Sequence, residues 1–257
     1  MKIIDTHCHL YSDEFTKDID EVLGRAQEEG VEKFYLPGID SSAIIAMIDL
    51  EKKFPGKCFA MMGLHPCSVK ENYKDELKIV EQWLETRSFA AIGEIGLDYY
   101  WDKTFIMEQV NAFKIQIEWS IDYHLPISIH CRNAVAETVD IVKNYVSKGL
   151  KGIFHCFSGS YEDAMEAINA GFYLGIGGVL TYKNSVLAEI LKKIDLQHIV
   201  LETDSPYLAP APFRGKRNES SYLKYIITKL AEIKNCSLEE VAAITTANAE
   251  KIFQVLK

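Results

Sequence analysis

Histidine and carboxylate side chains that can bind a divalent cation recur at separate places along the chain. The stretch IDTHCHL, residues 4–10, holds His7 and His9 on either side of Cys8. In an extended strand, residues two apart point to the same face, so both imidazoles face one way and the cysteine faces the other. Four imidazoles and two carboxylates suit a pair of divalent ions, and this chain offers His7, His9, Glu94, His130, His155 and Asp204.

The cysteines beside these histidines raise an alternative, a zinc site with mixed ligands. Cys8, Cys131 and Cys156 each follow a histidine directly. If strand alternation holds, each thiol points toward the surrounding helices, where it packs as a small hydrophobe. A cysteine-histidine zinc site would require that alternation to fail at three places. The six cysteines form no CxxC pair, which indicates reduced thiols.

Eight short apolar runs along the chain predict buried parallel strands: KIID, KFYLPG, CFAMMGLH, FAAIGEIGLD, PISIHC, GIFHCF, YLGIGG and HIVLETD. Segments with helical spacing lie between them, including residues 19–29, 41–54, 73–87, 104–123, 134–146 and 161–170. This alternation predicts an α/β fold, a single-domain (β/α)8 TIM-type barrel over residues 1–257, because an open sheet would leave two unpaired edges. Ser237 and Glu240 form the pattern of a capping box that opens a final helix toward Lys257.

The polar residues of these runs lie toward the C-terminal ends of the predicted strands. In a barrel of this kind that end carries the active site, so distant segments converge on one mouth and predict a metal site there. A single buried histidine is more often a hydrogen-bonded core residue, and His65 alone fits either interpretation. His124 and His198 precede predicted strands at the opposite end and are predicted to be structural.

Composition restricts the class of protein. Of the 257 residues, 48% are hydrophobic and 25% charged, as in a globular chain. No apolar run approaches the roughly 20 residues that cross a bilayer, and the N-terminal apolar stretch is too short for a secretory signal, so we expect a cytoplasmic protein with no membrane partner. The net charge of −9 argues against nonspecific adhesion to nucleic acid, although cations bound among the acids would offset it locally. No stable protein partner is evident.

An ordered set of motifs across the chain resembles the TatD family of metal-dependent deoxyribonucleases, which belongs to the amidohydrolase-like metal hydrolases. The motifs are DTHCHL near the N-terminus, GEIGLDYY at 93–100, PISIHCR at 126–132, FHCFSG at 154–159, LETDSPYL at 201–208 and RNES at 217–220. The resemblance implies that His7, His9 and Asp204 hold one metal and that His130 and His155 hold the second. It also implies the remaining roles: Glu94 bridges the metals, Glu202 holds a further ion or orients ligands, and His65 contacts phosphate.

Two departures from the family pattern concern the substrate contacts. Family members often carry histidine at the positions of Cys67 and Tyr100. The resemblance therefore constrains the metal ligands more closely than the groups that touch substrate.

These residues predict a hydrolase that cleaves phosphodiester bonds in DNA, and the resemblance implies trimming of single-stranded 3′ ends. Two divalent ions, Mg²⁺, Mn²⁺ or Zn²⁺, with a third as an option, would activate water and stabilise charge on phosphorus. Glu94 and Asp204 are the predicted catalytic carboxylates, with Asp204 as the base. The predicted substrate contacts are His65, Arg132 to a phosphate oxygen, Tyr207 to a base and Arg217 to the backbone.

Three alternatives stay open at this point. The same metals serve C–N hydrolysis of a cyclic amide or nucleobase, although a modified lysine often stands where this chain has Glu94. A protein that binds metal and phosphate without turnover is the second alternative. The sequence also leaves open whether the substrate is DNA, RNA or an aminoacyl-tRNA ester. For Arg132, a salt bridge to Asp98 or Glu202 competes with a phosphate contact.

Overall fold

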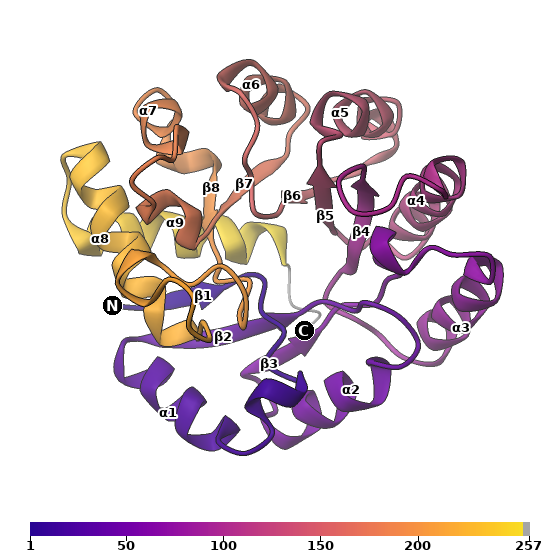
Figure 1. The fold of residues 1–257 in the computed structure, drawn as a ribbon, viewed down its shortest axis with the longest axis horizontal. Helices are drawn as coiled ribbons and strands as arrows, with labels where there is room; N and C mark the ends of the chain where they lie inside the picture. Colours follow the sequence, from indigo (N-terminus) through magenta and orange to yellow (C-terminus); the bar gives the residue numbers. More distant parts are fainter. Residues whose placement is uncertain (254–257) are drawn as a thin grey trace.

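Eight parallel strands alternate with helices along the chain in a computed structural model that describes residues 1–253. The strands are β1 (Ile3–Asp5), β2 (Val31–Leu36), β3 (Cys58–Ala60), β4 (Ile92–Asp98), β5 (Ile127–Arg132), β6 (Gly152–Phe154), β7 (Tyr173–Ile176) and β8 (Ile199–Leu201). The helices are α1 (Ile19–Glu28), α2 (Ile44–Lys53), α3 (Tyr73–Thr86), α4 (Ile106–Asp122), α5 (Val135–Lys143), α6 (Tyr161–Asn169), α7 (Leu187–Leu191), α8 (Leu223–Lys234) and α9 (Leu238–Ile252). Helices α1 to α8 surround the strands (Figure 1). The fold is the predicted (β/α)8 TIM-type barrel.

The strands form two parallel ladders that meet at two seams. One ladder has the order β1-β2-β3 and the other β4-β5-β6-β7-β8. At the first seam, just after β3, Met62 pairs with Ile92 in a parallel bridge. At the second seam, the N–H of Thr6 donates to the carbonyl of Leu201 at 3.0 Å. Each seam therefore brings the two ladders within hydrogen-bonding distance of each other.

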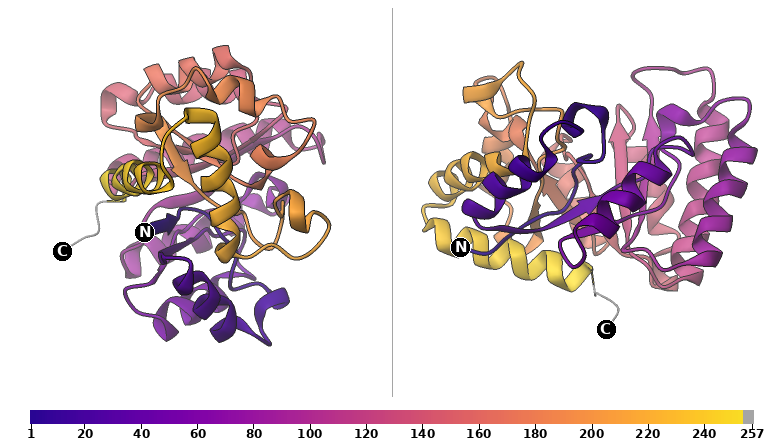
Figure 2. Two further views of the ribbon diagram at one scale, coloured as in Figure 1. Left: turned by 90° about the vertical axis from the view of Figure 1, so that its left-hand side faces the viewer. Right: turned by 90° about the horizontal axis from the view of Figure 1, so that it is seen from below.

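Two hydrophobic clusters stabilise this arrangement. The larger cluster fills the space between the strands and the outer helices, and α3 contributes to it through Leu77, Val80 and Leu84 at helical spacing. The smaller cluster lies inside the ring and contains Ile4, Tyr35, Met61, Ala91, Ile153, Val200, Ala249, Ile252 and Phe253. Its last three members belong to α9 and the residue after it, and α9 crosses the strands on the side where the chain begins (Figure 2). The N-terminal end of the barrel is thus plugged by α9.

The predicted helices are present, with ends that differ by a few residues. The helices expected over 104–123 and 134–146 end at Asp122 and Lys143. The hydroxyl of Ser237 accepts the N–H of Glu240 at 3.1 Å, which is one of the two bonds of the predicted capping box; the return bond from the Glu240 side chain does not form. Helix α9 ends at Ile252, and residues 254–257, which the predicted domain includes, lie outside the described residues. Within residues 1–253, no helix combines the length and apolar character of a membrane span.

An ion-pair network joins α1 to the segment that follows β8. The guanidinium of Arg25 makes two hydrogen bonds to the Glu219 carboxylate, at 2.9 and 2.6 Å. Arg217 pairs in the same two-pronged way with Asp18, at 2.8 and 2.6 Å. The side chain of Glu219 is only 7% exposed, so its charge depends on Arg25 for compensation. Although burial raises the pKa of Glu219, the bonds from Arg25 and Ser221 outweigh burial and lower it.

Arg25→Met is therefore expected to destabilise the protein by about 1–3 kcal/mol near neutral pH, because a largely buried carboxylate loses its partner. Because the pKa of Glu219 is lower in the folded protein than in the unfolded chain, where it is near 4.3, its ionisation stabilises the fold at pH values above 4.3. This stabilisation is lost as the pH falls through the pKa that Glu219 has in the folded protein. The difference between wild type and variant should thus shrink in acid. Urea unfolding at pH 7 and at lower pH values measures it.

Lys53→Met is the matched control, since it breaks the 2.6 Å pair of Lys53 with Asp20, whose side chains are about half exposed or more. Its expected cost is below about 1 kcal/mol. Two outcomes would contradict the view that Glu219 needs Arg25 to compensate its charge. One is an equal decrease in the free energy of unfolding in both variants, and the other is a decrease in Arg25→Met that does not depend on pH.

Candidate metal centre

A cavity of about 590 Å³ opens at the C-terminal ends of the strands. Its polar lining comes from at least six strands or the loops directly after them, so segments far apart in sequence meet there. These side chains include His9 after β1, His65 after β3, Glu94 on β4, His130 on β5, His155 after β6 and Asp204 after β8.

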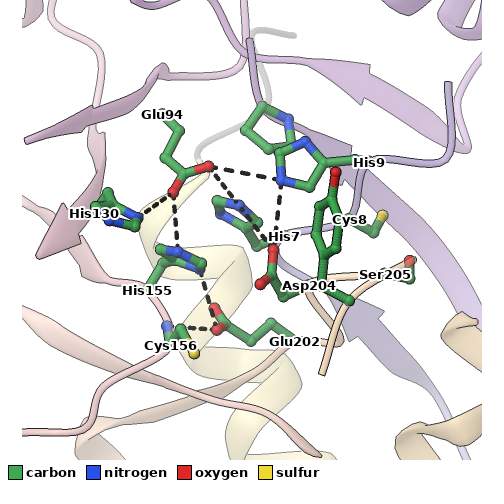
Figure 3. A network of polar contacts seen from close by, with 12 residues as sticks. His7, Cys8, His9, Glu94, His130, His155, Cys156, Glu202, Asp204 and Ser205 are labelled. Carbon is green, nitrogen blue, oxygen red and sulfur yellow. Dashed lines mark hydrogen bonds and ion pairs between the residues drawn. The ribbon is translucent and has the colours of Figure 1, made fainter. Parts of the chain in front are cut away.

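Glu94 lies at the centre of this group, with imidazole nitrogens on both carboxylate oxygens (Figure 3). Oε2 is 3.1 Å from Nε2 of His7 and 3.6 Å from Nε2 of His9. Oε1 is 2.8 Å from Nδ1 of His130 and 3.0 Å from Nε2 of His155. The carboxylate therefore separates the histidines into two pairs, as a bridging ligand would.

Asp204 joins the His7 and His9 side of the centre. Its Oδ1 lies 3.4 Å from Nε2 of His9 and 3.8 Å from Nε2 of His7. The potential ligand atoms of His7, His9 and Glu94 lie within 4.8 Å of one another, and so do those of His7, His155 and Asp204. The donor set, neutral imidazoles with carboxylates, fits divalent ions of the Mg²⁺, Mn²⁺ and Zn²⁺ class. A third such group joins His65, Glu94 and His130, and the ligand roles implied by the resemblance stay predictions.

A second layer of residues fixes the orientation of the histidine rings. Nδ1 of His9 lies 3.0 Å from the Tyr11 hydroxyl, which donates its own proton to the carbonyl of Pro37 at 2.6 Å. Tyr11 can therefore only accept from His9, which puts the proton on Nδ1 and leaves the Nε2 lone pair toward Glu94 and Asp204. Nδ1 of His7 lies 3.1 Å from the Ser128 hydroxyl. Such outer contacts orient metal-binding histidines.

Carboxylates take this outer position for the other two histidines. Nε2 of His130 is 2.8 Å from Asp98, and an ionised carboxylate only accepts, so Nε2 carries hydrogen and Nδ1 faces Glu94. Nδ1 of His155 is 3.3 Å from Oε1 of Glu202. Glu202 is fully buried. The structure thus places Glu202 behind His155, where it can orient that ring.

His65 differs from the other four histidines in its hydrogen bonding. Its Nδ1 accepts the backbone N–H of Cys67 at 3.0 Å. The neutral ring then carries its proton on Nε2, which lies 3.3 Å from Oε1 of Glu94. A protonated nitrogen donates and has no lone pair for a metal, so His65 is suited to a hydrogen bond toward an anion.

Local backbone features bring these side chains together. β1 ends at Asp5, and the carboxylate of Asp5 accepts the N–H and hydroxyl of Thr203 at 3.0 and 2.6 Å. This contact ties the turn that carries His7 to the turn that carries Asp204. Asp204 has φ 54°, a left-handed conformation that is uncommon for residues other than glycine but that aspartate adopts more readily than most. At Gly175 a Cβ would lie 2.2 Å from Glu202, so only glycine leaves room for that carboxylate.

Electrostatics at the centre reflect a competition between burial and neighbouring charge. Burial raises the pKa of Glu94, but His155, His65 and His7 outweigh it and hold this pKa well below its usual range. Burial lowers the pKa of His155, yet Glu94 and Glu202 raise it well above the ordinary value. The buried acids therefore require positive charge around them, which protons on the rings or divalent cations can supply.

Arg132 and Tyr207 line the same cavity, as expected for substrate contacts, whereas Arg217 does not. The guanidinium of Arg217 is engaged by Asp18. Neither salt bridge considered for Arg132 forms, because its guanidinium stacks over the ring of Tyr100 at 3.7 Å. Asp98 was not among the predicted site residues. Its position four residues after Glu94, on the same face of β4, is the signal that marks it.

The cysteines follow the prediction in part. Cys8 is buried in the large core cluster, as predicted, whereas Cys131 is half-buried, packs against that cluster and also borders the cavity. The strand alternation expected for Cys156 is wrong, because β6 ends at Phe154 and Cys156 has φ 46°. Cys156 borders the cavity, and its N–H donates to Glu202 at 2.5 Å. Within residues 1–253, no group of potential metal ligands includes a cysteine.

Comparisons with known proteins agree with this geometry. The family described as TatD related DNase matches residues 4–254. The chain is 38% identical to the uncharacterized metal-dependent hydrolase YabD of Bacillus subtilis, over 98% of this chain and 99% of that protein. It is 29% identical to a protein of Erwinia tasmaniensis named 3′-5′ ssDNA/RNA exonuclease TatD, over 98% and 100%. The crystal structure of the TatD homologue YjjV from Escherichia coli superposes with a TM-score of 0.93 at 28% identity, over 99% and 98%.

His155→Ala is expected to lose metal, because it removes a ring that faces Glu94. We expect about two divalent ions per wild-type chain by elemental analysis, and fewer in the variant. Metal in 100-fold excess over its Kd should stabilise the wild type by about 2.7 kcal/mol, measured as a rise in the thermal unfolding temperature, and the variant by less. His124→Asn, at an exposed histidine with φ 55° that asparagine tolerates, is the control. Equal metal content in both variants would exclude His155 as a ligand.

Asp98→Asn is expected to weaken metal binding about 10- to 100-fold, because the amide no longer fixes the tautomer of His130. Isothermal titration with Mn²⁺ measures the effect. Asp49→Asn, at a side chain 64% exposed on α2, makes the same charge change away from the cavity. A loss of the same size in Asp49→Asn would show that net charge, and not ring orientation, sets the affinity.

Proposed function

The chain belongs to the TatD-related DNase family of metal-dependent hydrolases, and from this we propose that it removes nucleotides from the 3′ end of single-stranded DNA. The observation that carries the proposal is the position of Glu94, a buried carboxylate set between two pairs of histidines beside a cavity. A relative named as a 3′-5′ exonuclease acting on single-stranded DNA and RNA supports the polarity and the class of substrate.

His7, His9 and Asp204 would hold one ion, His130 and His155 the other, and Glu94 both. When bound, such cations activate a water molecule and stabilise the charge that develops on phosphorus. The roles of Tyr11, Ser128, Asp98 and Glu202 are then to keep the ring nitrogens aimed at the ions.

Asp204 has the properties of a base for the attacking water. Its side chain is 15% exposed, against 3% for Glu94, so it is the carboxylate of the cluster within easier reach of solvent in the cavity. Burial raises its pKa, but the bond from His9 and the charges of His155 and His7 lower it overall. Asp204 is therefore ionised near neutral pH and can accept a proton in the step that attacks phosphorus.

His65 and Arg132 provide the donors that a phosphodiester needs. Nε2 of His65 lies 3.3 Å from Oε1 of Glu94, and its N–H can donate to a phosphate oxygen that enters the cavity. The guanidinium of Arg132 lies at the cavity wall and forms no salt bridge with any carboxylate of residues 1–253. Its edge presents paired N–H groups in the geometry that matches two phosphate oxygens.

Purified protein is expected to shorten a 5′-labelled single-stranded oligonucleotide one nucleotide at a time in Mg²⁺ or Mn²⁺, and a chelator should abolish the reaction. Asp204→Asn should lower kcat about 10²- to 10⁴-fold, since it removes the base. His65→Phe should mainly raise KM, since it removes a phosphate donor.

His198→Gln, at a histidine before β8 and outside the cavity, is the control for these substitutions. Full activity in Asp204→Asn, or cleavage that survives chelation, would refute the mechanism. Hydrolysis of a cyclic amide without any shortening of the oligonucleotide would instead assign the site to C–N hydrolysis.

A further inference from the structure

Three side chains form a group on the rim of the cavity that the proposed chemistry leaves unexplained. Tyr100 and Trp101 follow β4, and Arg132 ends β5; we call these three residues the rim platform. The guanidinium carbon of Arg132 lies 3.7 Å from the centre of the Tyr100 ring and 5.3 Å from that of Trp101. The two aromatic rings meet edge to face at 5.0 Å.

The rim platform exposes aromatic surface beside the catalytic groups. Trp101 is 69% exposed, yet it and Arg132 both line the cavity. Tyr100 does not line the cavity, and its ring packs against the guanidinium of Arg132. A large exposed indole is unusual on a protein surface and indicates a binding contact when it adjoins a cavity.

Hydrogen bonds hold the rim platform in a fixed place. Oδ1 of Asp98 accepts the backbone N–H groups of Tyr100 and Trp101 at 2.9 and 3.0 Å. Gln109 on α4 clamps the backbone of Asp98 through its side-chain amide, at 2.9 and 3.2 Å. Oδ2 of the same Asp98 bonds to His130 at 2.8 Å. Trp101 therefore lies in a turn whose backbone is held by Asp98, and its side chain is exposed from that fixed position.

The position of the rim platform relative to the centre matches the dimensions of one nucleotide. Arg132 lies two residues beyond His130 on β5, and two residues of an extended strand span about 7 Å. A phosphate held next to His130 would therefore place the base of its own nucleotide at the platform. A planar guanidinium and an indole both stack well on nucleobases, and every base has a face that they can cover.

We propose that Trp101 and Arg132, supported by Tyr100, bind the nucleobase next to the phosphodiester that is cleaved. This inference rests on the proposed function and makes single-stranded nucleic acid the substrate, since a base must leave its own stack to reach the platform. The stacking is independent of base identity. The edge of Arg132 remains available to phosphate, because stacking uses the face of the guanidinium and hydrogen bonding uses its rim.

The test compares two oligonucleotides on protein that carries Asp204→Asn, so that cleavage does not interfere. One is a single-stranded oligothymidylate, and the other has the same backbone but lacks the bases of its two 3′-terminal nucleotides. Fluorescence anisotropy gives both dissociation constants in Mg²⁺. We expect the missing bases to weaken binding roughly 5- to 150-fold, and Trp101→Leu to bring the ratio of the two constants close to one.

Trp101 is the one exposed tryptophan of the described residues, so the part of the emission that is lost in Trp101→Leu provides a second measurement. The oligothymidylate should quench it more strongly than the oligonucleotide without terminal bases. Tyr123→Leu changes an aromatic residue that is 39% exposed at the end of α4, away from the cavity. It should leave the ratio of the two dissociation constants as it is in the protein that carries Asp204→Asn alone. Arg132→Lys keeps the charge but loses the planar face, so it should lower the ratio as well.

A ratio near one in the parent protein, or a ratio unaffected by Trp101→Leu, would overturn the inference even if wild-type protein shortens the oligonucleotide. Failure of the metal-loaded wild type to shorten the oligonucleotide would refute the proposed function separately. If neither oligonucleotide binds the Asp204→Asn protein, the inference falls, and the cleavage assay on the wild type alone decides the proposed function.

Discussion

The structure depends on the burial of one carboxylate, Glu94, in the middle of a ring of imidazoles. Burying an isolated carboxylate is costly, and only close cationic or donor groups offset that cost. Glu94 obtains them from His7, His65, His130 and His155, which stand on or after four different strands. A closed ring of parallel strands is an arrangement that brings four strand ends to within hydrogen-bonding distance of one side chain. The burial of Glu94 thus depends on the closed barrel, because the barrel brings the compensating imidazoles to it.

The outer contacts of the rings give the five histidines around Glu94 different protonation of the nitrogen that faces inward. A ring backed by an acceptor, such as His9 by Tyr11 or His130 by Asp98, keeps its inward nitrogen available as a ligand. His65 is backed by a donor, the N–H of Cys67, and so turns an N–H inward. The same residue type is thus suited to bind a metal or to donate to an anion according to a neighbour on its far side. Ligand spacing alone does not distinguish these cases.

The sequence was sufficient for the strand order of the barrel and for the convergence of the polar side chains, because both follow from apolar runs that end in charged or imidazole groups. It was not sufficient where the chain leaves the ladder. β1 and β6 stop before His7 and His155, so alternation could not predict Cys156, whose orientation follows from a left-handed φ. It also could not pair Arg217 with Asp18, because that contact joins residues 199 apart in sequence. Basic loop residues are equally compatible with solvent, an acid or a phosphate until their neighbours are known.

Asp98 connects the two functions that meet at the mouth of the barrel. One of its oxygens binds the ring of His130, and the other binds the N–H groups at Tyr100 and Trp101. A shift of this carboxylate would therefore move a predicted metal ligand and the aromatic turn together, which keeps their separation constant. Because the turn is held through backbone N–H groups, the side chain at position 101 can change without releasing that tether. The strength of base stacking can consequently change with the residue at position 101 while the geometry at His130 is preserved.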